Sequence, residues 1–214
     1  MVRAVVFDVG ETLIDETRIF SRWADRLGVP RGTFLGLIGA CAASDRPLEE
    51  AFRLVRPGID LPAEIARWAD DDPDGLRENF DADDLYPDVR PALAALHEAG
   101  LAVVVAGNQP PQARTALEAM DLPVDAIRTS DEWGTQKPDP EFFERVAHLC
   151  GAAASEIAYV GDRLDNDVLP AADAGMRPVL IRRGPWGYLH ATRPEAERVD
   201  VVDSLDELLG LLAP

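Results

Sequence analysis

From Tyr86 onward, the chain alternates between short apolar runs and stretches whose apolar residues fall at helical spacing. A chain that repeats a strand and then a helix forms a parallel sheet with helices on both faces, because each helix carries the chain back across the sheet. The apolar run Ala4–Phe7 predicts one further buried strand at the start. We therefore expect an α/β fold built on a Rossmann-like parallel sheet. The expected strands are residues 4–7, 101–106, 126–128, 157–160 and 178–181.

Residues 16–83 interrupt this alternation, because they contain helical patterns and no strand-like run. Trp23, Phe34 and Phe52 each lie in a separate run of apolar residues at helical spacing, and such aromatic residues predict the core of a small bundle. We therefore predict two domains. An α/β core comprises residues 1–15 and 84–214, and residues 16–83 form an inserted all-helical domain.

The chain is acidic, with 39 Asp and Glu against 21 Lys and Arg in 214 residues and a formal net charge of −18. Such a surface repels phosphate backbones and anionic lipids, so neither nucleic acid nor a membrane is expected as a partner. The two cysteines and three scattered histidines form neither a disulfide framework nor a metal-site spacing. The first strand begins by residue 4, without a preceding signal peptide, and no apolar run approaches the ~20 residues that span a bilayer. These observations predict a cytoplasmic protein, and the oligomeric state stays open.

Polar residues follow the expected strands at their carboxyl ends. Asp8 follows the first strand, Asn108 follows the second, and Asp162 follows the fourth, with Asp167 shortly after it. Lys137 lies in the loop that follows the third strand. The carboxyl ends of parallel strands lie along one edge of the sheet, where open α/β proteins bind their ligands. We therefore expect these side chains to converge.

This combination of side chains suits magnesium-assisted phosphoryl transfer. Mg²⁺ prefers a few carboxylates together with phosphate oxygens and water, which Asp8 and Asp162 could provide. A lysine such as Lys137 suits a phosphate and lowers the pKa of a neighbouring carboxylate. An aspartate can then act as the nucleophile and form an acyl phosphate.

Each of these residues also has a structural interpretation. Asp162 is typical of a glycine turn, and Lys137 is typical of a surface loop. Asp167 is typical of a helix N-cap, with Pro170 in the first turn, and we expect it both to cap that helix and to support the site. The placement of all of them after successive strands favours the functional interpretation.

The chain resembles the haloacid dehalogenase superfamily of aspartate-nucleophile hydrolases in motifs spread over its whole length. The matching segments are Phe7-Asp8-Val9-Gly10-Glu11-Thr12-Leu13, Asn108, Lys137-Pro138-Asp139-Pro140 and residues 161–167. The inserted helical domain resembles the small helical cap of that superfamily's first subclass. The resemblance implies an α/β hydrolase with a cap that reads the substrate.

Roles for individual residues also come from this resemblance. It implies that Asp8 is the nucleophile and that Thr12, Asn108 and Lys137 contact the phosphoryl group. The implied activity is that of a Mg²⁺-dependent phosphatase, a phosphoric monoester hydrolase that acts on a small phosphorylated metabolite through an aspartyl phosphate.

The resemblance also implies a metal site and shows two departures from the usual pattern. Mg²⁺ would be held by Asp8, Asp162 and the carbonyl of Gly10, with Asp167 in support. Gly10 stands where the phosphatases of the superfamily usually carry a second Asp, whose acid–base help is worth ~10²–10⁴-fold in rate. Gly107 stands where a hydroxyl residue usually precedes the asparagine. We therefore expect weak activity, with Glu11 as the nearest substitute acid and Asp15 or Glu16 as alternatives.

Two other functions stay open. A 2-haloacid dehalogenase also uses an aspartate nucleophile, and its halide leaving group needs no acid, which fits Gly10. A non-catalytic or regulatory protein could keep the fold and bind a phosphorylated ligand. The sequence does not identify the substrate. Three arginines at helical spacing, Arg18, Arg22 and Arg26, favour a solvated helix face over a phosphate-binding one.

Overall fold

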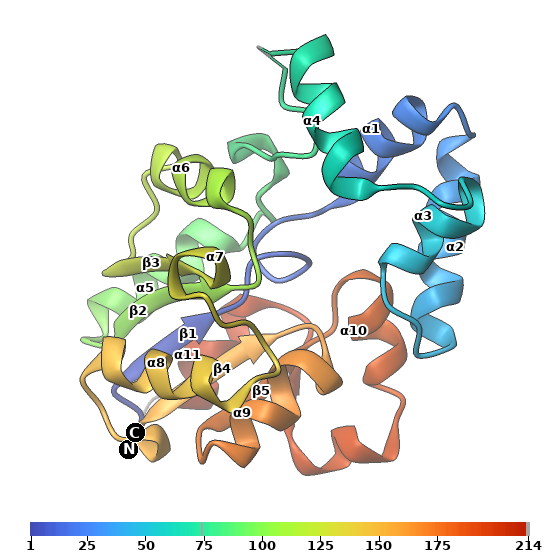
Figure 1. Cartoon of the computed structure of the whole chain (residues 1–214). Coiled ribbons are helices and arrows are strands. Elements are labelled where there is room, and N and C mark those ends of the chain that lie inside the picture. Colours follow the sequence, from blue (N-terminus) through green and yellow to red (C-terminus); the bar gives the residue numbers. More distant parts are fainter. Residues whose placement is uncertain (74, 213–214) are drawn as a thin grey trace. The chain divides into compact units, whose positions relative to one another are not determined.

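The computed structural model describes residues 1–73 and 75–212. The chain divides into two compact units, Met1–Asp15 with Leu85–Pro214, and Glu16–Asp84. We refer to them as the α/β unit and the helical unit (Figure 1). Within the described residues, no helix has both the length and the apolar character that crossing a membrane requires.

The α/β unit is built on one parallel sheet of six strands, in the order β3-β2-β1-β4-β5-β6. The chain therefore builds the sheet outward from β1 in one direction and then, from β4, in the other. The carboxyl ends of β1 and β4 flank the point where the order reverses, which is where such sheets bind ligands. The strands are β1 (Ala4–Phe7), β2 (Ala102–Gly107), β3 (Ala126–Thr129), β4 (Ile157–Gly161), β5 (Arg177–Ile181) and β6 (Asp200–Val202).

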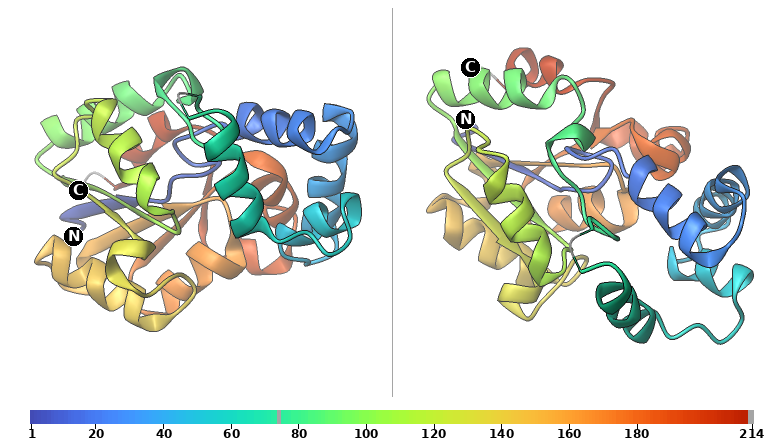
Figure 2. Two further views of the ribbon diagram at one scale, coloured as in Figure 1. Left: turned by 45° about the horizontal axis from the view of Figure 1, so that its top comes forward. Right: turned by 90° about the horizontal axis from the view of Figure 1, so that it is seen from above.

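Helices cover both faces of this sheet, as Figures 1 and 2 show. Helices α8 (Pro140–Cys150) and α9 (Leu169–Asp173) pack on one face, and α5 (Val89–Glu98) and α11 (Leu208–Leu212) pack on the other. The remaining helices are α6 (Pro111–Ala119), α7 (Ser130–Trp133) and α10 (Gly184–His190). This arrangement confirms the expected α/β fold with a Rossmann-like parallel sheet.

The core under α8 follows from the alternation of side chains along the strands. Val6 of β1 and Tyr159 of β4 point to this face and pack against Phe142, Phe143 and Val146 of α8. Helix α8 begins as the sequence indicates, because the Asp139 side chain accepts the Glu141 N–H at 3.0 Å and Pro140 occupies the first turn.

The helical unit contains α1 (Thr17–Leu27), α2 (Arg31–Ala43), α3 (Glu49–Val55), α4 (Leu61–Asp71) and a short turn, η1 (Ala82–Asp84). Its core is aromatic. Trp23 packs edge-to-face on both Phe52 and Trp68, with ring centroids 4.9 Å apart in each pair. Phe34 packs in the same way on Phe52, at 5.0 Å. These rings form the bundle core that their spacing predicts.

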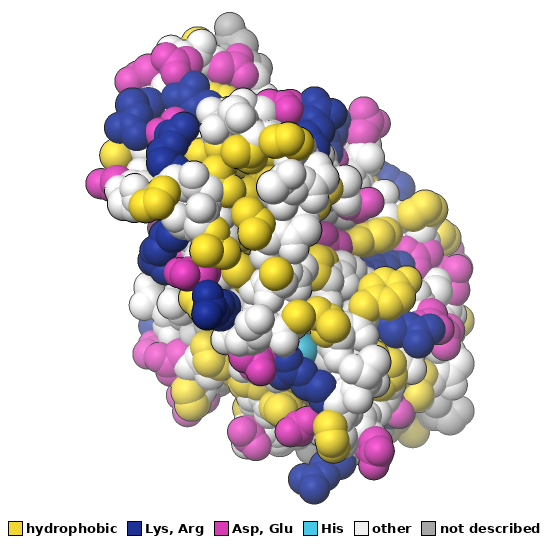
Figure 3. Space-filling view, turned by 90° about the vertical axis from the view of Figure 1, so that its right-hand side faces the viewer, with side chains coloured by type: hydrophobic (Ala, Val, Ile, Leu, Met, Phe, Trp, Pro, Cys, Tyr) yellow, Lys and Arg dark blue, Asp and Glu magenta, His cyan; other side chains and the backbone are white. Residues whose placement is uncertain are grey.

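The arginine row of α1 corrects one expectation. Arg18 pairs with Asp81 and Asp84 at 2.5 Å, and Arg22 donates a hydrogen bond to the Asn79 carbonyl at 3.0 Å. Arg26 pairs with Glu64 at 2.8 Å. The row therefore joins α1 to the rest of the helical unit and is not a solvated face. On the face that Figure 3 shows, arginine side chains lie among Asp and Glu side chains and form no single basic patch.

Candidate active site

The loop that follows β1 is folded tightly on itself. The Asp8 N–H donates to the Val160 carbonyl at 2.9 Å, which continues the pairing of β1 with β4. The Leu13 and Ile14 N–H groups both donate to the Val9 carbonyl. We call residues 8–14 the nucleophile loop. Because both of its ends are tied to the sheet or to the loop itself, Asp8 stays at the carboxyl edge of β1.

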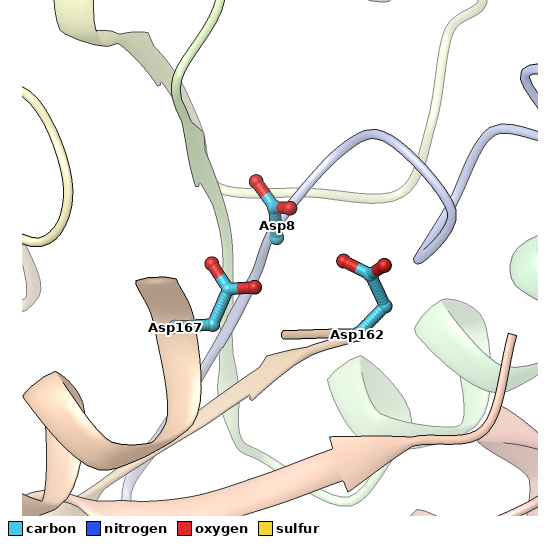
Figure 4. A group of neighbouring side chains, drawn as sticks. All are labelled: Asp8, Asp162 and Asp167. Atoms are coloured by element: carbon cyan, nitrogen blue, oxygen red, sulfur yellow. The ribbon is translucent and has the colours of Figure 1, made fainter. Parts of the chain in front are cut away.

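Three carboxylates meet at this edge (Figure 4). They come from Asp8 after β1, Asp162 after β4 and Asp167 in η3 (Leu164–Val168), a single π-helical turn. Each offers an oxygen that lies within 4.8 Å of the others, and all three residues are buried. Asp167 does not cap the following helix as expected. The π turn begins at Leu164, so Asp167 lies inside it and not at the start of α9. Its side chain instead accepts the Arg163 N–H at 3.0 Å.

Lys137 places its ammonium group between two of these carboxylates. Its Nζ atom lies 2.6 Å from Asp8 Oδ1 and 2.5 Å from Asp167 Oδ1, and it lies 5.6 Å from the centre of the Tyr159 ring. The side chain is fully buried, so Lys137 is not a surface loop lysine. It is also the single lysine among the 21 basic residues of the chain.

Asn108 holds the backbone of Lys137 in place. Its Oδ1 accepts the Lys137 N–H at 2.8 Å, and its Nδ2 donates to the Lys137 carbonyl at 2.9 Å. The asparagine after β2 and the lysine after β3 therefore form one hydrogen-bonded pair. Within the described part of the chain, the second N–H of the Asn108 amide has no acceptor, so it can donate to another group.

Burial and charge determine how these groups titrate. Burial by itself lowers the pKa of Lys137, but the carboxylates of Asp167 and Asp8 outweigh it and hold that pKa well above its usual value. Burial, together with the charges on Asp167 and Asp8, raises the pKa of Asp162 well above its usual range. Burial also raises the pKa of Asp167, to about 6, although Lys137 opposes the shift. One ammonium thus pairs with two of the three carboxylates, Asp8 and Asp167.

Thr12 is the remaining residue expected at the phosphoryl group. It is fully buried, and its hydroxyl has no hydrogen-bond partner among the described residues. A buried polar atom without a partner is costly, so this hydroxyl is available to donate to a further acceptor. Its carbonyl accepts a hydrogen bond from Arg183 at 2.6 Å.

The two glycines that depart from the usual pattern have different surroundings. A Cβ atom at Gly107 would lie 2.5 Å from Asp8 Oδ1, so this glycine leaves the space that the Asp8 carboxylate occupies. Gly10 pairs with Ile14 across the loop and lies outside the positive-φ region, whereas Glu11 next to it has a φ of 49°. Glu11 is buried and accepts a hydrogen bond from the Tyr86 hydroxyl.

Sequence reasoning missed two residues around this loop, Tyr86 and Arg183. The available signal for Arg183 was its position two residues after the end of the buried strand β5, at the edge where the other site residues lie. A separate cavity of about 460 Å³ opens beside Asn108 and is lined by Ser130, Thr135 and Gln136, among others. None of the three carboxylates lines it, so it is distinct from the cluster.

A model of the haloacid dehalogenase-like hydrolase family matches residues 57–175, which is more than half of the chain. The chain belongs to this family of hydrolases. Its motifs and its sheet agree with that membership, as the resemblance predicts.

Curated relatives carry the names of phosphatases. Glyceraldehyde 3-phosphate phosphatase of Methanopyrus kandleri is 29% identical, over 99% of this chain and 97% of that protein. Phosphoserine phosphatase of Thermus thermophilus is 36% identical, over 52% of this chain and 45% of that protein. Phosphoglycolate phosphatase of Vibrio parahaemolyticus is 33% identical, over 60% and 57%.

Solved structures show the same fold. A haloacid dehalogenase-like hydrolase from Bacteroides fragilis superposes with a TM-score of 0.71 at 21% identity, over 97% of this chain and all of that one. A structure titled as a dehalogenase gives a TM-score of 0.69 at 24% identity, over 100% of this chain and 98% of that chain. At these identities the likeness concerns the fold alone.

Proposed function

We propose that this hydrolase is a phosphatase that moves the phosphoryl group of a small phosphorylated metabolite first to Asp8 and then to water. The observation that carries the proposal is the position of Asp8. Its carboxylate lies at the switch point of the sheet, 2.6 Å from a buried ammonium and beside two further carboxylates. This is the environment in which an aspartate acts as a nucleophile toward phosphorus.

The neighbouring residues each have a task in this proposal. The Lys137 ammonium pairs with Asp8 and balances negative charge on the incoming phosphoryl group. The Thr12 hydroxyl, which lacks a partner among the described residues, donates a hydrogen bond to a phosphoryl oxygen. Asn108 holds Lys137 in place and donates its second N–H to the same group.

A divalent cation fits the remaining charge. Among the described side chains, none donates a hydrogen bond to Asp162 or forms an ion pair with it, so one buried carboxylate is left uncompensated. Three carboxylates within reach of one another are hard oxygen donors of the kind that Mg²⁺ prefers. We propose that Asp8, Asp162 and the Gly10 carbonyl hold Mg²⁺ and that Asp167 supports them through Lys137. When bound, the ion would neutralise charge on the transferring group.

The absence of an acid at position 10 shapes the expected substrate preference. A phosphatase without a positioned proton donor should act slowly on alkyl phosphates, whose leaving oxygen needs a proton. It should act faster on p-nitrophenyl phosphate, whose leaving group departs without one. We further propose that the helical unit, Glu16–Asp84, is the cap that selects the substrate.

The relatives suggest which metabolites to test. Their names refer to glyceraldehyde 3-phosphate, phosphoglycolate and phosphoserine, all small phosphorylated compounds. Phosphate release should be measured on these and on p-nitrophenyl phosphate, with Mg²⁺ and with a chelator. We expect turnover only with Mg²⁺, and its loss by at least ~10³-fold in Asp8→Asn, because the amide keeps the size but is not a nucleophile.

The same preparation separates the other two functions. A 2-haloacid dehalogenase would release halide from 2-chloropropionate in the presence of the chelator. A regulatory protein would bind phosphate compounds without turnover. Wild-type rates retained by Asp8→Asn would contradict the covalent route through this residue.

A further inference from the structure

Glu11 is a buried carboxylate that the proposed reaction does not use. It lies in the nucleophile loop with a φ of 49°, a left-handed conformation that is unfavourable for a residue with a side chain. Its side chain fills space that Gly184 leaves, because a Cβ atom there would lie 2.5 Å from Glu11 Cγ. A strained residue persists only where its surroundings hold it, and such residues cluster at functional sites.

Tyr86 holds the Glu11 side chain. The Tyr86 hydroxyl donates to Glu11 Oε2 at 2.5 Å. Burial, and then the negative charge of Glu11, raises the pKa of Tyr86, so the hydroxyl keeps the proton that it donates. The Tyr86 N–H also donates to the Leu13 carbonyl at 3.0 Å, and Ile14 pairs with Leu85. Tyr86 therefore forms hydrogen bonds to the nucleophile loop with both its side chain and its backbone.

Arg183 completes the arrangement from the end of β5. Its guanidinium lies 4.2 Å from the centre of the Tyr86 ring and donates to the Thr12 carbonyl at 2.6 Å. It also pairs with Asp88. Asp88 in turn accepts hydrogen bonds from the Ser204 hydroxyl at 2.7 Å and the Leu205 N–H at 2.9 Å. We call Glu11, Tyr86, Arg183 and Asp88 the loop clamp.

The loop clamp lies close to both points where the chain passes between the α/β unit and the helical unit. Tyr86 lies directly after Leu85, where the chain re-enters the α/β unit from residues 16–84. Glu11 and Thr12 lie between the nucleophile Asp8 and Asp15, where the chain leaves that unit. The clamp thus joins the segment that returns from the helical unit to the loop that carries the reacting residues.

We propose that Glu11 and Tyr86 are positioning residues, whose hydrogen bond sets the conformation of the nucleophile loop from the point where the chain returns to the α/β unit. A displacement of Tyr86 would move Glu11 and, next to it, Gly10. It would also move Arg183, which contacts the Tyr86 ring, and with it Thr12. The kinetic part of this inference rests on the proposed phosphatase function. Its structural part is testable without any turnover.

Three variants test the hydrogen bond itself. Tyr86→Phe removes the hydroxyl and keeps the ring under Arg183. Glu11→Gly removes the carboxylate and also relieves the positive φ, so this variant should fold at least as well as the wild type. Glu11→Gln keeps an oxygen that can accept the Tyr86 hydrogen bond. Tyr188→Phe is the matched control, because Tyr188 is 62% exposed and lies outside the clamp.

We expect Tyr86→Phe and Glu11→Gly each to lower kcat on p-nitrophenyl phosphate about 10-fold, with KM within about twofold, because a displaced nucleophile affects the reaction more than binding. Glu11→Gln should keep most of the rate, and Tyr188→Phe should keep all of it. The double variant Tyr86→Phe/Glu11→Gly should be no slower than either single one, since both remove the same interaction. Additive losses, or a full rate in Glu11→Gly, would overturn the proposal.

Amide hydrogen exchange of residues 9–14 gives a readout that does not depend on activity. Tyr86→Phe and Glu11→Gly should speed exchange in this segment, whereas Tyr188→Phe should leave it unchanged. Unchanged exchange in the first two variants would overturn the clamp. If the wild type turns over no phosphate ester, the proposed function fails, while faster exchange in the two variants would still support the clamp.

Discussion

Two clusters of charged side chains among the described residues contain buried carboxylates but have opposite charge balances. In the helical unit, one carboxylate, Glu64, meets three arginines. Its oxygens lie 2.8 Å from Arg26, 3.0 Å from Arg56 and 2.6 Å from Arg67. In the α/β unit, three carboxylates lie together, and the one ammonium of Lys137 pairs with two of them, Asp8 and Asp167. The first cluster is saturated with cations, and the second carries an excess of negative charge.

The titration of the two clusters reflects this difference. Hydrogen bonds from Arg67 and Arg26 lower the pKa of Glu64, so its charged form is stabilised by folding. Burial and the neighbouring carboxylates raise the pKa of Asp162, so its charged form is disfavoured. A buried carboxylate that only holds a fold together is expected to have cationic partners, as Glu64 does. A buried carboxylate without such a partner instead indicates a site for a cation or a reacting group. The comparison therefore separates a structural cluster from the candidate active site.

The largest expected effect is at Lys137. Lys137→Met leaves three buried carboxylates without a cation and should lower the free energy of unfolding by about 3–5 kcal/mol, measured by urea denaturation. Lys137→Arg keeps the charge, but its planar guanidinium does not fit a fully buried space shaped for a point charge, so activity should still be lost. Arg145→Met, at an exposed pair with Glu141 on α8, is the control. If Lys137→Met lowered the free energy of unfolding no more than Arg145→Met does, the carboxylate cluster would not differ from an exposed ion pair.

The position of this lysine illustrates what the sequence could predict. Polar residues after successive parallel strands must lie along one edge, so the approach of Lys137 to Asp8 follows from the topology. The π turn around Asp167 and the positive φ of Glu11 do not follow, because both depend on packing against distant residues such as Lys137, Tyr86 and Gly184. A local pattern contains no information about those contacts.

The elements that sequence reasoning missed have the same explanation. Strand β6 has three residues, of which only Val202 is buried, so its apolar pattern is too short to recognise. Helix α10 begins at Gly184-Pro185, which is more typical of a turn. The arginine row of α1 has the spacing of a solvated face, and its partners Asp81, Asp84 and Glu64 come from other parts of the helical unit.

The next largest effect is expected at Glu64. Glu64→Gln removes the charge that three arginines share and should lower the free energy of unfolding by about 1–2 kcal/mol, because the arginines are partly exposed and solvent screens them. Glu141→Gln, at the exposed pair with Arg145, should change stability by less than about 0.5 kcal/mol. Equal effects in the two variants would show that the Glu64 cluster adds no more than a surface pair.

The lowered pKa of Glu64 is tested by the pH dependence of the difference in unfolding free energy between wild type and Glu64→Gln. A carboxyl whose pKa is lowered by folding stabilises the protein at pH values above its unfolded pKa, near ~4.3. This contribution is lost as the pH falls from there through the lower folded pKa. The gap in unfolding free energy between wild type and Glu64→Gln should therefore be constant from neutral pH to about pH 5 and shrink below about pH 4. A gap that widens toward acid pH would contradict the assignment.

The smallest expected effect is at Asp162 and has the opposite sign. Without a divalent cation, Asp162→Asn should raise the free energy of unfolding by about 1 kcal/mol, because it removes repulsion between buried carboxylates and adds an amide that can donate to them. Mg²⁺ should then raise the Tm of the wild type and leave that of the variant almost unchanged, since a ligand stabilises only the state that binds it. Asp165→Asn is the control, because Asp165 pairs with Arg163 and should not affect the response to Mg²⁺. If Asp162→Asn destabilised the metal-free protein as Glu64→Gln is expected to do, the charge of Asp162 would be stabilised in the folded protein like that of Glu64. The contrast between a paired and an unpaired buried carboxylate would then fail. An equal Mg²⁺ response in wild type and Asp162→Asn would instead place the ion elsewhere.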